Sequence, residues 1–238
     1  MLDRTVSSIV RENFIYARAL YYLGVNFFEV EEVSLMQVCE KSGINTSKLL
    51  RCFYEFENDS KSSFRELQEY PVELLLEYLR HCHQLFIKDK LPFVSFLVDN
   101  HSSAASQDLK IIFPVFAEDF IKHIYEEEDQ LFQYIKSLAK IEAGIEKNPA
   151  RIRIKYPDLC LKHIQQHHLE EDEMESMRDL IDSFIANDLH GDVIINELRA
   201  FDRELLFHAQ IENEILFPKA IALETKVFQK IEGLSQSN

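Results

Sequence analysis

The chain has few of the residues that make tight turns, with only 5 glycines and 6 prolines among 238 residues. This scarcity argues against an all-β fold, which needs many turns. No run of about 18 apolar residues occurs, so the sequence predicts no transmembrane helix. The four cysteines are scattered and form no Cys-x-x-Cys pair. Their spacing favours free thiols in a reducing compartment over a zinc ribbon or a disulfide framework.

Basic residues are fewer than acidic ones, with 26 Lys and Arg against 41 Asp and Glu, which gives a net charge of −15 and an isoelectric point of about 5.0. The basic face that nonspecific binding to nucleic acid or to an anionic membrane requires is therefore not expected. The first residues contain no apolar segment of a signal peptide, and we expect a cytoplasmic protein. Hydrophobic residues make up 46% of the chain, with Leu, Ile, Phe, Glu and Lys abundant. This composition supports a large core and predicts an all-α fold.

The first part of the chain has the pattern of several short helices. Apolar spacing predicts a helix over residues 6–22. A second helix is expected between an N-cap at Ser34 and a stop at Gly43, and a third begins at Asn45 or Thr46. Two helices joined by a short turn with glycine also outline a helix-turn-helix. The acidic balance of this region argues against DNA binding.

Composition divides the chain into two predicted domains. Residues 1–56 form a small helical N-terminal domain, and the polar stretch 57–70 forms a linker. Residues 71–238 form the second domain, which contains long amphipathic segments joined by short loops. Four such segments predict an up-down-up-down four-helix bundle. The segments run over about 71–100, with a kink expected at Pro92, and over 107–140, 157–187 and 193–224.

Two His-x-x-x-Glu pairs lie on the apolar stripes of this bundle. His123 and Glu127 form one pair, and His208 and Glu212 form the other. Four residues of helix rotate a side chain by about 40° and raise it by about 6 Å, so the members of each pair share a face. Burying an unpaired charge costs several kcal/mol, so such groups are normally paired or bound to a metal. The repeated pair therefore predicts a metal site.

Further histidines fall on the other stripes. His83 and His101 are 18 residues apart, or about five helical turns, and share a face if the kink at Pro92 is mild. His163 and His167 lie one turn apart on the third segment. Three histidines fall outside the stripes: His81, expected to face solvent, His190, expected in a surface loop, and His168, rotated about 100° from His167.

Together these groups would place five to seven polar side chains in one buried layer, which without a metal could not all be satisfied. Two metal ions would satisfy them, with imidazoles as terminal ligands and Glu127 and Glu212 as bridges. This nitrogen and oxygen donor set suits iron, with manganese as the alternative, and does not indicate structural zinc. Glu-x-x-His, His-Glu-x-x-His, P-loop and Gly-x-Ser-x-Gly motifs are absent, so no catalytic residue is predicted.

The two His-x-x-x-Glu pairs, the second followed by Leu216-Phe217-Pro218, resemble the hemerythrin-like cation-binding domain. That domain is a four-helix bundle around a non-haem di-iron centre. The two-part layout more narrowly resembles the Repair of Iron Centers (RIC) family, which is linked to recovery of iron–sulfur clusters after nitric oxide or oxidant damage. The N-terminal resemblance rests on Leu23-Gly24-Val25-Asn26-Phe27, Ser34-Leu35, Gly43-Ile44 and Leu49-Leu50.

The resemblance implies a ligand set for two iron ions. In the third segment it favours His168, whereas the apolar phase set by Met174 and Met177 favours His167, which we prefer. His163 is a further candidate on that segment, as in oxygen carriers. The other implied ligands are His83, His101, His123, Glu127, His208 and Glu212.

One departure concerns a cysteine pair of the family's N-terminal domain, whose positions here read Phe28-Glu29. A function that depends on those thiols is not expected, and the domain is expected to dock or to dimerise. The resemblance implies a di-iron protein of nitrosative or oxidative stress response that meets nitric oxide, oxygen or peroxide and serves iron–sulfur proteins. The alternatives are an oxygen-binding or sensing module and a helix-turn-helix regulator with a di-iron sensor. Enzymatic activity is left open.

Overall fold

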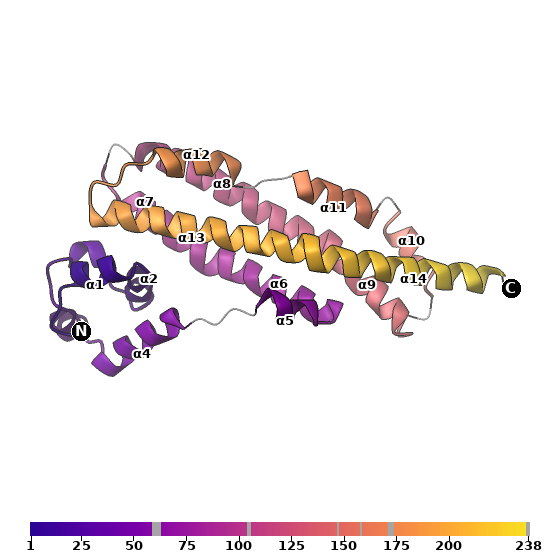
Figure 1. Ribbon diagram of the computed structural model, residues 1–238, viewed down its shortest axis with the longest axis horizontal. Coiled ribbons are helices and arrows are strands. Elements are labelled where there is room, and N and C mark those ends of the chain that lie inside the picture. The colour runs from indigo at the N-terminus through magenta and orange to yellow at the C-terminus, as the bar shows by residue number, and fades with distance from the viewer. Residues whose placement is uncertain (59–62, 104–105, 147, 158, 171–173, 237–238) are drawn as a thin grey trace. The chain divides into compact units, whose positions relative to one another are not determined.

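The computed structural model describes the chain except residues 59–62, 104–105, 147, 158, 171–173 and 237–238 (Figure 1). The described residues are helical and contain no β-strand, apart from one isolated bridge between Thr5 and Ser34. The prediction of an all-α fold is therefore confirmed. Within the described part of the chain, no helix combines the length and the hydropathy needed to cross a membrane. The four cysteines are free thiols, as expected.

Contacts divide the chain into two compact units, each assembled from three stretches of sequence. The first unit consists of Met1–Lys61, Lys90–Pro114 and Met177–Phe201. The second consists of Ser62–Asp89, Val115–Ser176 and Asp202–Asn238. The stretch 57–70, which the sequence marks as a linker, contains helix α5 (Phe64–Gln68). A capping box between Ser63 and Glu66 satisfies the first backbone N–H groups of this helix.

The N-terminal helices follow the predicted order with one correction. The single helix expected over 6–22 is interrupted, because Asn13 adopts an extended conformation and its Oδ1 accepts a hydrogen bond from the Ile15 N–H. Ser34 and Gly43 cap the next helix as predicted, and Gly43 has a φ of 64°, which favours glycine. The elements are α1 (Val6–Glu12), α2 (Ile15–Tyr22), η1 (Phe27–Glu29), α3 (Leu35–Ser42) and α4 (Thr46–Glu57).

Within the first unit these helices pack on longer helices from later in the chain. Arg18 on α2 lies 3.8 Å from Glu197 on α13 (Leu189–Ile211), and both side chains are buried. The ring of Tyr21 packs against Phe93 and Phe96 of α7 (Leu91–Asn100). The N-terminal helices therefore share a core with these helices.

Each of three predicted long segments is helical but contains one π-helical turn. A π-turn ends at Lys90, two residues before Pro92, where the sequence predicts a kink. The remaining elements are α6 (Val72–Leu85), η2 (Phe86–Lys90), α8 (Ser106–Glu127), η3 (Glu128–Phe132), α9 (Gln133–Glu142), α10 (Arg151–Lys155), α11 (Leu161–Glu170), α12 (Glu175–Ser183), η4 (Glu212–Leu216) and α14 (Phe217–Gln236).

The third predicted segment, 157–187, forms two helices, α11 and α12, in its described residues. The last segment begins at Leu189, four residues earlier than predicted, and extends well beyond Glu224.

The core of the second unit brings together helices that are distant in sequence (Figure 1). Helix α14 contacts α9 and α11, while α6 contacts α9 and η4. Apolar side chains from all of these elements form one buried cluster, including Leu76, Leu79, Leu131, Phe132, Leu138, Ile215 and Phe217. This cluster provides the rigid surroundings in which the polar side chains of the next section are held.

Candidate metal centre

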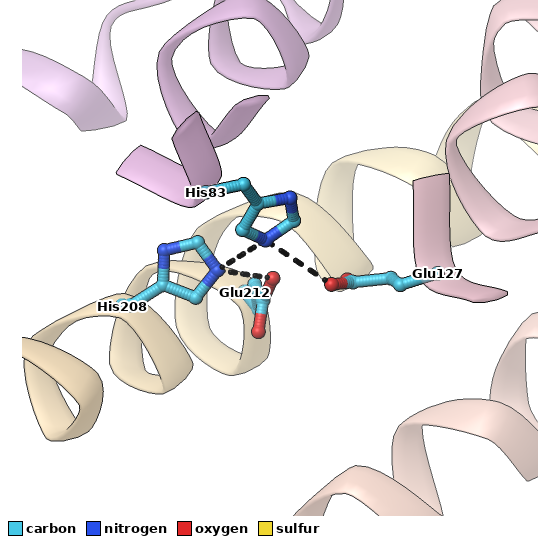
Figure 2. Close-up of side chains that lie close together, drawn as sticks. All are labelled: His83, Glu127, His208 and Glu212. Carbon is cyan, nitrogen blue, oxygen red and sulfur yellow. Dashed lines mark hydrogen bonds and ion pairs between the residues drawn. The ribbon is translucent and has the colours of Figure 1, made fainter. Parts of the chain in front are cut away.

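Four polar side chains meet inside the second unit. His83 comes from α6, Glu127 from the last turn of α8, His208 from α13, and Glu212 from the first position of η4 (Figure 2). All four are buried, with exposures of 1% for His83, 6% for Glu127, 8% for His208 and 3% for Glu212. They form a group whose ligand atoms all lie within 4.8 Å of one another. Two nitrogen and two carboxylate donors thus converge from three helices.

The shortest distances within the group all involve the Nε2 atom of His83 or His208. The Nε2 atoms of His83 and His208 lie 3.0 Å apart. His83 Nε2 is also 3.4 Å from Glu127 Oε2, and His208 Nε2 is 3.0 Å from Glu212 Oε1. Figure 2 shows both imidazole rings turning a nitrogen toward the carboxylates. The predicted pairing of His208 with Glu212 on one helix face is confirmed.

Aromatic side chains form the wall beside the histidines. Phe132 stacks on the His83 ring with centroids 5.5 Å apart, and Phe86 meets the His208 ring edge-on at 5.6 Å. Phe120 lies behind Phe86, with centroids 5.9 Å apart. These rings keep water away from the donors and lower the local dielectric, which strengthens any interaction with a cation.

Burial raises the pKa of the Glu127 carboxyl, and the neighbouring Glu212 raises it further, while His83 acts in the opposite direction. For His83, burial lowers the pKa, but Glu127, Glu212 and Glu128 together outweigh that effect, so the pKa is raised. Two carboxylates in one dry site disfavour each other's ionised form. The site is therefore short of positive charge.

A divalent cation fits this arrangement. Glu127 Oε1 is buried and has no hydrogen-bond partner among the residues that the structure describes. Leaving such an atom unsatisfied costs about 1–3 kcal/mol or more, so a native site normally provides a partner for it. A metal ion would satisfy this oxygen and offset the repulsion between the carboxylates. The group His83, Glu127, His208 and Glu212 could thus hold a metal ion.

A π-turn adjoins the ligands on each contributing helix. The turn η2 begins three residues after His83, η3 follows Glu127 directly, and η4 begins at Glu212. A π-turn contains one more residue than an α-helical turn and is frequent at functional sites. The apolar periodicity of the sequence does not predict these π-turns. Their positions beside the candidate ligands link them to the metal centre.

A second pair of histidines lies in the same unit. His123 is one turn before Glu127 on α8, and its ring centroid is 5.7 Å from that of His168 on α11. His168 is half-buried and meets Phe217 edge-on at 5.2 Å. His163 and His167 are exposed. The expectation that His167 faces the core is wrong, because Met174 and Met177, which set its phase, follow the end of α11.

His101 is not brought into the group of four. It ends α7 as the C-cap residue in an extended conformation, so helical spacing from His83 no longer applies. Its Nε2 lies 3.1 Å from Asp188 Oδ1, and Ser103 Oγ lies 3.2 Å from its Nδ1. Among the remaining histidines, His81 is exposed as predicted.

His190 is not the surface loop residue that the sequence suggested. It is 5% exposed and lies in the first turn of α13. Its ring stacks on Phe28 with centroids 4.3 Å apart, and the His101 ring is 4.9 Å away.

The pKa of His190 is lowered from its ordinary value of 6.5 to about 4, because burial and the neighbouring His101 outweigh the smaller opposing effects of Leu97 and Asp188. Between these two values the unfolded chain binds a proton at His190 that the folded chain does not. The stability that this group contributes is therefore complete above pH 6.5 and is lost as the pH falls toward 4.

His190→Phe retains the stack on Phe28 and removes the titrating group. We expect urea denaturation of this variant to show a weaker loss of stability between pH 6.5 and 4 than the wild-type protein shows. His81→Phe, at an exposed position, is the control and should leave the pH profile unchanged. An identical pH profile for His190→Phe and the wild type would contradict the assignment.

Compared with models of known protein families, with curated proteins and with solved structures, the chain matches none.

Proposed function

We propose that the protein is a non-haem di-iron protein of hemerythrin-like four-helix architecture that acts in the response to nitrosative or oxidative stress. The observation that supports this most directly is the pair of buried carboxylates, Glu127 and Glu212, whose oxygens lie within 4.8 Å of each other and of two imidazole nitrogens. Nitrogen and carboxylate donors without a thiolate suit iron or manganese. Two carboxylates that share one site also suit bridging between ions.

The second ion would use the other histidine pair. His123 shares a helix face with Glu127, because residues four apart on a helix are neighbours. His168 faces His123 from α11 and is partly shielded by Phe217. In this arrangement His83 and His208 would hold one ion, and His123 and His168 would hold the other.

An iron pair supplies redox chemistry and an open coordination position for nitric oxide, oxygen or peroxide. The residues of the chain determine what reaches that position. Phe132 and Phe86 pack against the imidazoles of His83 and His208, with Phe120 behind Phe86, and these rings exclude bulk water. The two carboxylates favour cations over anionic species at the centre. Release of iron toward damaged iron–sulfur clusters is the role that we assign to this site.

Metal analysis after anaerobic loading tests the proposal. We expect two ferrous ions per chain, and after oxidation a Mössbauer spectrum of a spin-coupled ferric pair. Metal that binds only the folded state stabilises it, by about 2.7 kcal/mol when free metal is 100 times Kd, so loading should raise the melting temperature. Protein that takes up no iron, or that binds manganese and rejects iron under the same conditions, would contradict the proposal.

Variants in α11 assign the second ion. His168→Ala should reduce the iron content to one ion per chain, whereas His167→Ala and His163→Ala, at exposed positions, should retain both ions. Loss of iron in His167→Ala but not in His168→Ala would reverse the assignment within α11.

The repair role needs a separate assay. The ferrous-loaded protein is mixed with a [4Fe–4S] protein whose cluster has been damaged by nitric oxide, and cluster absorption is followed. We expect recovery with wild-type protein and none with the Glu212→Gln variant. Recovery that is equal with free ferrous iron would mean that the protein only stores the metal.

A further inference from the structure

His83 is held from both sides of its ring. Its Nε2 faces His208 and Glu127, two other members of the candidate metal centre. Its Nδ1 lies 2.9 Å from Oε1 of Glu128, a residue that the sequence pattern did not single out. Glu128 is largely but not completely buried and begins the π-turn η3. Consecutive side chains of one helix point about 100° apart. Glu127 and Glu128 nevertheless contact the two different nitrogens of the same imidazole.

This geometry constrains the proton on the imidazole. An ionised carboxylate only accepts hydrogen bonds, so Glu128 requires the proton on Nδ1. Glu127 lies 3.4 Å from Nε2, a longer contact than the 2.9 Å between Glu128 and Nδ1. A neutral His83 that donates from Nδ1 has its lone pair on Nε2, and that atom faces His208 and Glu127.

Glu128 is itself oriented by a cation. Its Oε2 accepts a hydrogen bond from Arg80 Nε at 3.1 Å, and Arg80 comes from the turn of α6 that precedes His83. Arg80 also lies 3.8 Å from Glu77, which in turn binds Lys136 of α9 at 2.7 Å. Three ion pairs in series thus connect Glu128 through Arg80 and Glu77 to Lys136, and Arg80 holds the Glu128 carboxylate on the Nδ1 side of the His83 ring.

We propose that Glu128 is a positioning residue that fixes the tautomer and the orientation of His83, so that Nε2 is presented as a metal ligand. The inference rests on the proposed function for its purpose, but the tautomer is a property of the metal-free protein. Carboxylate partners of metal-binding histidines orient the ring and raise its basicity, and their loss typically lowers metal affinity by about 10- to 100-fold.

Three substitutions separate positioning from general charge effects. Glu128→Ala removes the acceptor, while Glu128→Gln keeps an acceptor oxygen but loses the charge that binds Arg80. Glu126→Gln is the matched control, because Glu126 is exposed on the same helix and contacts only Lys122 among the ion pairs described. Thermal unfolding confirms that each variant folds before it is compared.

The first measurement uses metal-free, ¹⁵N-labelled protein in buffer alkaline enough to keep His83 neutral. Long-range ¹H–¹⁵N correlation spectra distinguish the two tautomers, with His83→Gln to assign the signals. We expect the Nδ1–H tautomer in the wild type and in Glu126→Gln, and a shift toward Nε2–H in Glu128→Ala, with Glu128→Gln intermediate. A wild-type His83 in the Nε2–H form, or a tautomer unchanged by Glu128→Ala, would overturn the proposal.

The second measurement is Co²⁺ affinity by competition with a chelator. We expect affinity about 10- to 100-fold lower for Glu128→Ala than for Glu126→Gln, with a smaller loss for Glu128→Gln. Equal affinities for Glu128→Ala and Glu126→Gln would also count against positioning. If the wild type binds neither cobalt nor iron, the proposed function fails, and the tautomer measurement alone still decides the role of Glu128.

Discussion

His208→Ala should lose at least one metal ion and should also be less stable without metal. His208 Nε2 is within 3.0 Å of both His83 Nε2 and Glu212 Oε1, so its removal takes a donor from the centre of the group. Leaving a buried polar group short of an interaction partner costs about 1–3 kcal/mol or more. Iron content by elemental analysis and the free energy of unfolding in urea, each with and without metal, measure the two effects.

His190→Ala is the matched control, because His190 is also a buried imidazole but contacts Phe28 and His101 rather than the metal group. This variant should lose stability through its cavity and keep its iron. If His208→Ala bound as much iron as the wild type with the same affinity, the assignment of the metal centre would be wrong.

Glu127→Gln should change stability in opposite directions in the two metal states. Without metal, the substitution removes a buried carboxylate whose pKa is raised by burial and by Glu212. A buried carboxyl group whose pKa is raised contributes unfavourably to stability at a pH where it must ionise, and an uncharged amide of similar size avoids that cost, so the metal-free variant should be more stable. With metal, the variant lacks an anionic ligand, so it should bind fewer ions and lose most of the metal-dependent rise in melting temperature.

A metal ligand is distinguished from a structural residue by this opposite change, with higher stability in the absence of metal and lower stability in its presence. Glu126→Gln removes the same charge from the neighbouring exposed position and should change neither melting temperature appreciably. A Glu127→Gln protein that is less stable than the wild type in the absence of metal would show that the carboxylate stabilises the fold by itself.

The parts of the site that could be predicted are those determined within one helix. His208 and Glu212 are one turn apart, so periodicity alone placed them on a shared face, and the structure confirms that they meet. Ser34 and Gly43 were also predictable, because capping depends on a few adjacent residues. Between His83 and His101 the helix contains a π-turn and ends before His101, so helical spacing does not predict whether these two side chains share a face.

Contacts between helices were not predictable from periodicity. Glu128 stands next to a predicted ligand and falls off its stripe, and only the approach of α6 shows that it holds His83. His190 is buried because helices from the start of the chain cover it, with Phe28 stacked on its ring. The choice between His167 and His168 depended on a phase that was extended past the end of α11.

The three π-turns also affect how this chain can be compared with others. Each one adds a residue relative to an uninterrupted α-helix, so the apolar stripes before and after it are out of register by one position. An alignment that assumes continuous helices would therefore match core positions on one side of a π-turn and surface positions on the other. Allowing a one-residue gap within 86–90, 128–132 and 212–216 would align the helical halves separately and keep the ligands in register.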